Sequence, residues 1–160
     1  MHMKQIIGIT AILMLFLTAC GQQTTPKQTK YAITKSDTEW KNLLSPTAFE
    51  IMVKRGTEAP YKNAYYNNHE KGIYVSAATG EPLFSSDDKF DSGTGWPSFT
   101  KPINGKSVMV VKDDSFGMSR DEVVEAKTGL HLGHVFDDGP KDKGGLRYCM
   151  NSGALKFIKK

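Results

Sequence analysis

Hydrophobic and polar positions divide the chain into three parts. Residues 6–17 are almost wholly apolar, residues 22–36 are mostly polar, and short apolar runs then alternate with turns rich in glycine and aspartate. The first run, about a dozen residues, is too short to cross a bilayer and is typical of a signal-peptide core. The polar stretch cannot bury a core and predicts a flexible tether. The expected segments are a leader (1–19), a tether (20–36) and a folded domain (37–160).

Two short helices are expected at the start of the folded domain. Ser36 and Asp37 offer a helix cap before a run with apolar residues at helical spacing. Ser45 precedes Pro46, and a capping serine followed by proline in the first turn is typical of a helix start. The second helix carries its apolar residues on one face and is expected to end before Gly56.

The rest of the domain has the pattern of short β-strands. The expected strands are Gly72–Val75, Pro82–Phe84, Lys106–Lys112 (as a buried strand), Val123–Val124, His131–Phe136, Gly145–Met150 and Ala154–Ile158. Turns are frequent and the pattern lacks the crossover helices of a parallel sheet, which favours a mainly β, antiparallel domain with a small helical N-terminal cover. The expected core includes Trp40, Phe49, Phe84, Val110 and Phe136.

The leader ends in Leu17-Thr18-Ala19-Cys20-Gly21, which resembles a bacterial lipobox. In such a sequence the cysteine is lipidated and becomes the new N-terminus, and acyl chains then hold the protein at a membrane. The alternative is a plain secretory signal that happens to be cleaved near a cysteine. We expect an exported protein, lipid-anchored through Cys20 to the bacterial cell envelope. Removal of residues 1–19 leaves 141 of the 160 residues, which is enough for one domain.

Charge and cysteine content narrow the possible functions. The net charge of +4 is mild, and no block of basic residues with interleaved aromatics occurs, so nucleic-acid binding has little support. The only cysteine besides Cys20 is Cys149. The mature domain therefore cannot form an internal disulfide, and any redox partner of Cys149 must come from outside.

Cys149 is a candidate nucleophile. It lies in Arg147-Tyr148-Cys149-Met150-Asn151-Ser152, where Arg147 and Asn151 share its face if the segment is a strand. A guanidinium on that face favours the reactive thiolate, and the amide can donate a hydrogen bond to a substrate. The alternative is a buried, inert cysteine, which is common in proteins.

His131 and His134 are candidate bases for this nucleophile. They are three residues apart and would face opposite sides of a regular strand, but Gly133 between them is typical of a bulge that could turn both toward one pocket. Asp138 in the following turn could orient a histidine or share its proton. One alternative is that a histidine is purely structural. Another is a zinc site of both histidines, Cys149 and Asp138, although their spacing matches no common zinc pattern.

The loop Ser92–Phe99 presents Trp96 and Phe99 beside a proline. Its two aromatic residues either anchor it in the core or form an apolar wall for a small alkyl group. The loop does not have the pattern of a phosphate-binding loop, because no Lys-Ser/Thr pair or helix follows its glycines.

Five blocks, in order, resemble the B-type methionine sulfoxide reductases, which reduce the R epimer of methionine sulfoxide. These blocks are 80–84 (GEPLF), 89–93 (KFDSG), 95–99 (GWPSF), 131–140 (HLGHVFDDGP) and 147–152 (RYCMNS). The resemblance implies two antiparallel β-sheets with short N-terminal helices. It also implies a peptide-methionine (R)-S-oxide reductase that acts on oxidised methionine in proteins and peptides.

The resemblance also assigns roles by position. Cys149 matches the catalytic cysteine, and Trp96 matches the tryptophan that packs against the ε-methyl group of the substrate. The positions that line the active site in the family are here His131, His134, Asp138, Arg147 and Asn151. Phe99 is expected to extend the substrate-binding wall. The implied mechanism is attack by Cys149 on the sulfoxide sulfur, release of methionine and formation of a sulfenic acid.

Two departures from the family pattern change the expected cofactors and partners. Many members bind a structural zinc through two Cys-x-x-Cys pairs, but the corresponding residues here are Ser76, Thr79, Glu125 and Thr128. We therefore expect no zinc and no other cofactor. Thr94 stands where many members have a recycling cysteine, so the reductant should be an external dithiol, such as an exported, thioredoxin-like protein. The expected protein is a monomer that repairs oxidised exported proteins.

Two other classes of protein share some of these features. A cysteine hydrolase would use the same Cys/His pair, but it would form an acyl intermediate. A lipid-anchored binding protein would need no reactive thiol. Oxidation of Cys149 together with production of methionine separates the reductase from both.

Overall fold

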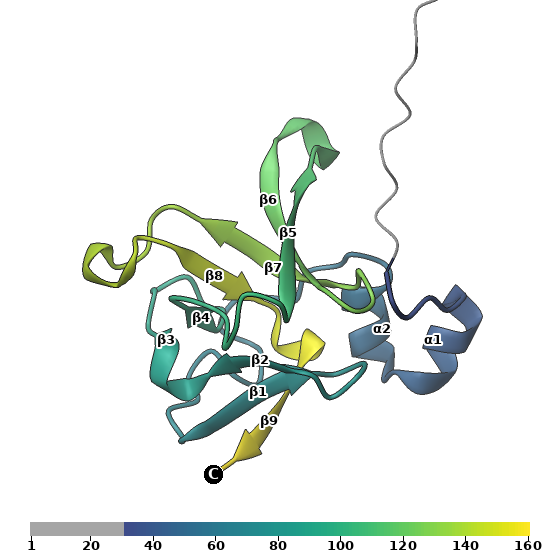
Figure 1. The fold of residues 1–160 in the computed structure, drawn as a ribbon, viewed down its shortest axis with the longest axis horizontal. Helices are drawn as coiled ribbons and strands as arrows, with labels where there is room; N and C mark the ends of the chain where they lie inside the picture. Colours follow the sequence, from purple (N-terminus) through teal and green to yellow (C-terminus); the bar gives the residue numbers. More distant parts are fainter. Residues whose placement is uncertain (1–30) are drawn as a thin grey trace, which may run out of the picture.

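The structure is a computed structural model and describes residues 31–160 (Figure 1). In this part of the chain two antiparallel sheets are present, one of three strands in the order β2–β1–β9 and one of six in the order β3–β4–β8–β7–β6–β5. The expected mainly β fold with N-terminal helices is confirmed. The leader, Cys20 and most of the expected tether lie outside the described residues. Among the helices that the structure describes, none has the length and apolar character needed to cross a membrane.

Six of the nine strands in residues 31–160 lie within two residues of their expected bounds, the strand expected at Val123–Val124 is longer, and the two strands of two residues were not expected. The three-stranded sheet contains β1 (Gly72–Ser76), β2 (Pro82–Ser85) and β9 (Leu155–Lys159). The six-stranded sheet contains β3 (Lys89–Phe90), β4 (Ser98–Phe99), β5 (Val108–Asp113), β6 (Arg120–Glu125), β7 (His131–Phe136) and β8 (Arg147–Met150). Short 3-10 helices lie at Ser86–Asp88, Ser115–Gly117, Lys141–Lys143 and Ser152–Ala154.

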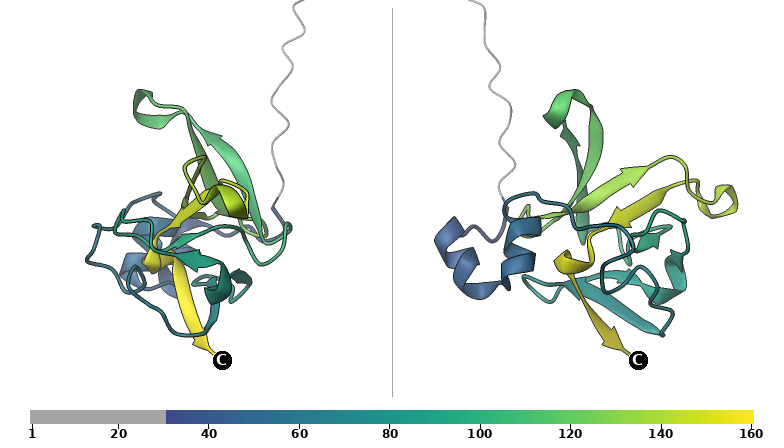
Figure 2. Two further views of the ribbon diagram at one scale, coloured as in Figure 1. Left: turned by 90° about the vertical axis from the view of Figure 1, so that its left-hand side faces the viewer. Right: turned by 180° about the vertical axis from the view of Figure 1, so that it is seen from behind.

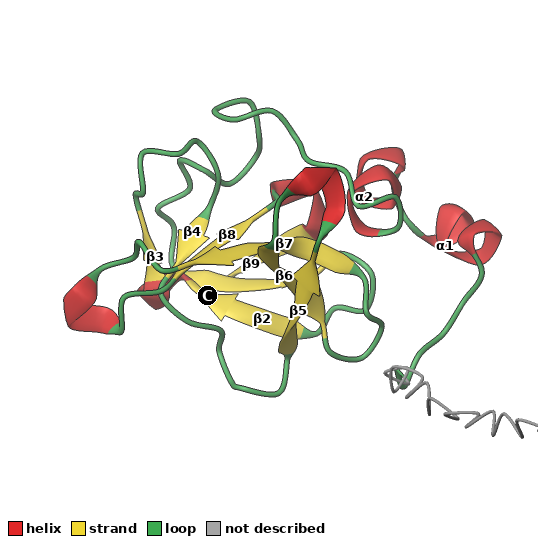
Figure 3. Cartoon of the chain, turned by 90° about the horizontal axis from the view of Figure 1, so that it is seen from above, coloured by secondary structure: helices red, strands yellow, loops and turns green. Residues whose placement is uncertain are grey.

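Helices α1 (Asp37–Leu43) and α2 (Pro46–Met52) start at the predicted caps. The hydroxyl of Ser36 accepts a hydrogen bond from the backbone of Glu39 at 3.3 Å, and that of Ser45 accepts one from Ala48 at 3.2 Å. Both helices lie at one end of the sheets, as Figure 3 shows. Helix α2 buries its apolar face against β7 and the 3-10 helix after β8, so it supports the strands that carry the site.

An aromatic cluster joins the two sheets. Phe84 of β2 stacks on Phe99 of β4 with ring centroids 4.6 Å apart, and Tyr74 of β1 meets Phe99 edge-on at 5.0 Å. All three side chains are completely buried. Trp40, Phe49 and Phe84 are thus confirmed as core residues, since Trp40 and Phe49 are also buried.

Two members of the predicted core are on the surface instead. Val110 is 48% exposed and Phe136 is 37% exposed. The expectation of a buried strand at 106–112 was wrong because β5 is the edge strand of the six-stranded sheet. Figure 2 shows the β5–β6 hairpin projecting away from the three-stranded sheet, which leaves part of β5 uncovered.

The predicted irregularity at Gly133 is present. Val123 pairs with Gly133 but Val124 pairs with His131, so β7 has one extra residue opposite β6. A Cβ atom on Gly133 would lie 2.1 Å from the carbonyl oxygen of Cys149, so only glycine permits this approach of β7 to β8.

Of the four residues expected to stand at the zinc-cysteine positions, three surround the buried carboxylate of the fourth, Glu125. Glu125 is completely buried, and its Oε2 accepts hydrogen bonds from Ser76 at 3.1 Å and Thr128 at 2.8 Å. The hydroxyl of Thr79 donates to Oε1. This hydroxyl–carboxylate cluster ties the β1–β2 turn to the β6–β7 turn and so links the two sheets. Residues 31–160 contain no group of three or more His, Cys, Asp and Glu side chains placed to hold a metal ion.

Candidate active site

Cys149 lies on β8 between two strands that supply its neighbours. It pairs with Ser98 of β4 on one side and with His134 of β7 on the other. A cavity of about 180 Å³ opens beside it. The walls of this cavity include Trp96, Arg120, His134, Phe136, Cys149 and Asn151. Residues from four separate parts of the chain therefore surround the thiol.

The surroundings of the Cys149 thiol act on its pKa in opposite directions. Burial raises the pKa above the ordinary value, and the charge of Arg147 together with hydrogen bonds from Thr94, Ser98 and Arg147 lowers it. The net shift is upward. The predicted effect of Arg147 is present, but burial outweighs it, so the resting cysteine is mostly a thiol at neutral pH.

Arg147 is held by Asp138 and Phe136. Its Nε and Nη2 donate to the two oxygens of Asp138 at 2.7 and 2.8 Å, and its guanidinium lies 4.4 Å from the centre of the Phe136 ring. The guanidinium of Arg147 lowers the pKa of Asp138. Asp138 therefore orients the arginine beside Cys149, and the expectation that it pairs with a histidine was wrong.

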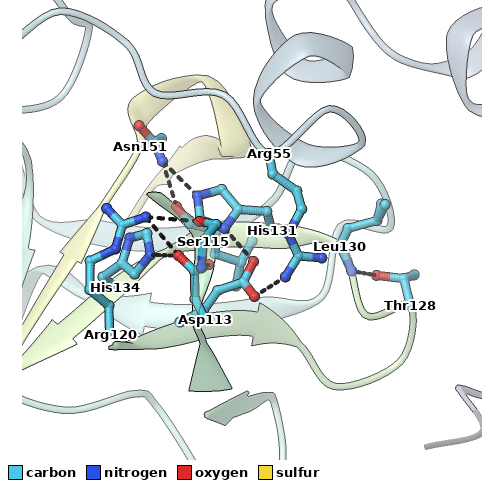
Figure 4. A network of polar contacts seen from close by, with 11 residues as sticks. Arg55, Asp113, Ser115, Arg120, Thr128, Leu130, His131, His134 and Asn151 are labelled. Atoms are coloured by element: carbon cyan, nitrogen blue, oxygen red, sulfur yellow. Dashed lines mark hydrogen bonds and ion pairs between the residues drawn. The ribbon is translucent and has the colours of Figure 1, made fainter. Parts of the chain in front are cut away.

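His134 faces a carboxylate that the sequence did not reveal. Its Nε2 lies 3.0 Å from Oδ2 of Asp113, which also receives Nη2 of Arg120 at 2.7 Å (Figure 4). Hydrogen bonds from Ser115 and His134 hold the pKa of Asp113 well below its usual range. Burial lowers the pKa of His134, and the hydrogen bond to Asp113 only partly opposes this. His134 is thus a neutral imidazole whose Nε2 donates to a carboxylate.

His131 has a similar arrangement deeper in the protein. Its Nδ1 lies 2.6 Å from Oε1 of Glu122, and Glu122 also pairs with Arg55. Its Nε2 lies 3.5 Å from Nδ2 of Asn151. The two imidazole rings have centroids 5.3 Å apart, which confirms that the bulge brings His131 and His134 together. His134 lines the cavity, whereas His131 lies behind it and contacts two lining residues, His134 and Asn151.

Glu58, in the segment after α2, organises the other wall of the cavity. Its backbone oxygen accepts a hydrogen bond from Nε1 of Trp96 at 3.1 Å, and its backbone nitrogen lies 3.3 Å from Oδ1 of Asn151. Its carboxylate accepts hydrogen bonds from the backbone of Ser152 and, at 3.0 Å, of Gly153. Glu58 therefore fixes the indole and the segment that follows Cys149.

Phe99 does not belong to the site. It is completely buried in the aromatic cluster, because Ser98 points toward Cys149 and successive residues of a strand face opposite sides. The expectation that Phe99 forms part of a substrate wall was wrong.

Sequence reasoning also missed four polar residues of the site, namely Glu58, Asp113, Arg120 and Glu122. They belong to none of the five motif blocks. Arg120 and Glu122 lie on β6, which carries charged residues on a strand of the sheet, and this was a signal that the sequence pattern alone did not interpret.

A model of one protein family, described as the SelR domain, matches residues 44–159 of the chain. The matched range contains α2, both sheets, the cavity beside Cys149 and the cluster around Glu125.

Proposed function

Because the chain belongs to the SelR domain family, it is a methionine-R-sulfoxide reductase, and we propose that Cys149 is its nucleophile and the adjacent cavity its substrate site. The observation that carries this proposal is the position of Cys149. It is the one thiol of the folded domain, it pairs across the sheet with His134, and it shares a cavity with Trp96.

Substrate binding follows from the two sides of the cavity. Trp96 offers an apolar surface for the methyl group of oxidised methionine, and Glu58 keeps its indole in place. The sulfoxide sulfur then faces Cys149, and its oxygen faces the polar wall that includes His134 and Asn151.

The first chemical step needs both a thiolate and a proton for the sulfoxide oxygen. Before the reaction Cys149 is a thiol and His134 is a neutral imidazole. Because Nε2 of His134 donates to Asp113, its Nδ1 is free to accept a proton. His134 accepts the thiol proton while the sulfur of Cys149 attacks the sulfoxide sulfur, and it returns the proton to the oxygen as the S–O bond breaks. The oxygen ends on Cys149 as a sulfenic acid, methionine leaves, and the two electrons come from the cysteine.

Recycling requires thiols from outside the domain. One external thiol condenses with the sulfenic acid, which releases water and forms a mixed disulfide, and a second thiol reduces that disulfide. Thr94 supports this route because it places a hydroxyl, not a second thiol, beside Cys149. We propose an exported, thioredoxin-like dithiol protein as the reductant and oxidised exported proteins as the substrates.

Metal and localisation form the remaining part of the proposal. The hydroxyl–carboxylate cluster around Glu125 stands at the positions of the zinc cysteines, which supports a domain without structural zinc. The sequence Leu17–Gly21 supports lipidation of Cys20 and attachment to the cell envelope. We take the protein to act as a monomer.

The intact mass of the protein after one equivalent of substrate tests the mechanism. With methionine R-sulfoxide, the wild-type domain should gain one oxygen, release methionine and react with dimedone at Cys149. Cys149→Ser should do none of these, and the S epimer serves as the control substrate. Loss of two hydrogens, an acyl adduct or an unchanged thiol would each contradict the proposed chemistry.

Membrane fractionation tests the anchor. The wild-type protein should fractionate with membranes and carry acyl chains on Cys20. Cys20→Ala should be released or remain unprocessed. A soluble wild-type protein with an unmodified Cys20 would contradict this part of the proposal.

A further inference from the structure

Arg120 enters the cavity from the start of β6 with most of its hydrogen-bond donors unused. Its Nη2 lies 2.7 Å from Oδ2 of Asp113 and 3.5 Å from the hydroxyl of Ser115. The guanidinium makes no other hydrogen bond to the described residues. Its Nε is buried and has no hydrogen-bond partner. No other buried side-chain nitrogen or oxygen of residues 31–160 lacks a partner. Buried donors are almost always paired in folded proteins, so the environment of this guanidinium is incompletely satisfied by the protein. Nη1 makes no hydrogen bond to the described residues either, so Arg120, which lines the cavity, has donors free for a ligand.

Arg147 does not line the cavity, and His134 and Asn151, which do, have hydrogen-bond partners. Arg147 uses Nε and Nη2 on Asp138. Nε2 of His134 donates to Asp113, and Nδ2 of Asn151 lies 3.2 Å from the carbonyl oxygen of Leu132. Among the described residues that line the cavity, Arg120 is therefore the one arginine or lysine, and its Nη1 donors are free.

The chemistry of the substrate matches such a donor. A sulfoxide oxygen carries partial negative charge and accepts hydrogen bonds, and its negative charge grows as the S–O bond breaks. The thioether of methionine is only a weak acceptor. Trp96, Cys149 and Arg120 all line the cavity of about 180 Å³. A substrate whose methyl group contacts Trp96 and whose sulfur faces Cys149 would therefore have its oxygen near the polar wall that contains Arg120.

We propose that Arg120 is a substrate-binding residue whose guanidinium donates a hydrogen bond to the sulfoxide oxygen. This contact makes the cavity bind oxidised methionine more tightly than methionine, so it favours entry of the substrate and release of the product. The inference rests on the proposed assignment of the Cys149 cavity as the substrate site.

Equilibrium binding to a protein that cannot turn over isolates this contact from the chemistry. The background is full-length Cys149→Ser, and the probes are N-acetylmethionine methylamide and its R-sulfoxide, titrated by calorimetry or ligand-observed NMR. Adding Arg120→Met should weaken sulfoxide binding by about tenfold, the effect of losing one hydrogen bond to a charged donor, and leave thioether binding unchanged. Arg120→Lys keeps a cation beside Asp113 and should lose less.

A matched control removes a cation from the same hairpin without touching the cavity. Lys112 on β5 is exposed and pairs with Asp121 at 2.7 Å. In the same background, Lys112→Met should leave the affinities of both probes unchanged. If Arg120→Met does not fold, the test uses Arg120→Lys, in which the ratio of sulfoxide affinity to thioether affinity should fall. An unchanged ratio in that variant would overturn the inference.

The outcomes separate the contact from a structural role. Equal weakening of both probes would show that Arg120 only shapes the cavity, and no weakening of either would show that it does not touch the substrate. Each result overturns the inference. If Cys149→Ser with Arg120 intact binds neither probe, the proposed substrate site fails, and the inference fails with it. That failure is visible without any change at Arg120.

Discussion

Nδ1 of His131 lies 2.6 Å from the carboxylate of Glu122, and both side chains are almost completely buried. Glu122 also forms an ion pair with Arg55. Because a carboxylate only accepts hydrogen bonds, Nδ1 carries the ring proton and Nε2 faces Asn151 as an acceptor. A buried carboxylate thus selects the tautomer of a histidine beside the Cys149 cavity.

Replacing Glu122 should therefore damage turnover more than substrate binding. In Glu122→Gln the amide can donate as well as accept, so His131 loses its fixed tautomer and Arg55 loses its charged partner. We expect kcat to fall by about 10–100-fold, as happens when carboxylate partners of metal-bound histidines are removed, with little change in KM. Steady-state kinetics on the R-sulfoxide measure this. Asp121→Asn, on the same strand and paired with exposed Lys112, is the control, and an unchanged kcat for Glu122→Gln would reject the assigned role.

Thr94→Cys should create an internal recycling route. The hydroxyl of Thr94 is near enough to the thiol of Cys149 to lower its pKa, and it lies 2.8 Å from the hydroxyl of Ser92. A thiol in its place therefore starts near the oxidised sulfur. After one equivalent of substrate this variant should lose two hydrogens, whereas the wild-type domain gains one oxygen. Intact mass spectrometry distinguishes the two.

The control for this variant is Thr38→Cys, in which an exposed residue of α1 receives the new thiol. It should behave like the wild type and retain the sulfenic acid. If Thr94→Cys also keeps the oxygen, the loop does not hold residue 94 within reach of Cys149.

The reaction of Cys149 with iodoacetamide should require a higher pH than that of a free cysteine. Burial raises the pKa of this thiol, and only the thiolate reacts, so the rate of alkylation should increase with pH to a midpoint above that of a free cysteine. Arg147→Gln removes a group that lowers this pKa and should move the midpoint higher still. Rates measured on Cys20→Ala report Cys149 alone, and a midpoint below that of a free cysteine would show that Arg147 and the hydroxyls outweigh burial.

The cluster around Glu125 should contribute stability and not activity. Glu125→Ala leaves the hydroxyls of Ser76, Thr79 and Thr128 without their shared acceptor and creates a small cavity between the sheets. We expect the free energy of unfolding to fall by about 3 kcal/mol, with kcat retained in the folded protein.

Urea unfolding followed by fluorescence measures this loss. Glu70→Ala removes an exposed partner of Lys159 and should change stability by less than about 0.5 kcal/mol. Equal effects of the two substitutions would show that the buried cluster has no special part in joining the sheets.

The sequence by itself determined the features that depend on near neighbours along the chain. Ser36 and Ser45 start helices because capping is a contact over three residues. Arg147 and Cys149 come together because they are alternate residues of one strand, and Gly133 marks the bulge because a side chain there would collide with β8. The matches to family motifs placed Cys149, His131 and His134 for the same reason, since each motif is local.

Only the tertiary structure decided which distant residues meet. Register places Glu122 opposite His134 and Asp113 opposite Arg120, and the two carboxylates then reach His131 and His134. No pattern within one strand specifies its register against another. Exposure likewise depends on strand order, so Val110 on an edge strand is open to solvent although its own sequence is that of a core strand. Asp138 turned to Arg147 rather than a histidine because the turn after β7 lies beside the start of β8, where the guanidinium satisfies both oxygens of the carboxylate.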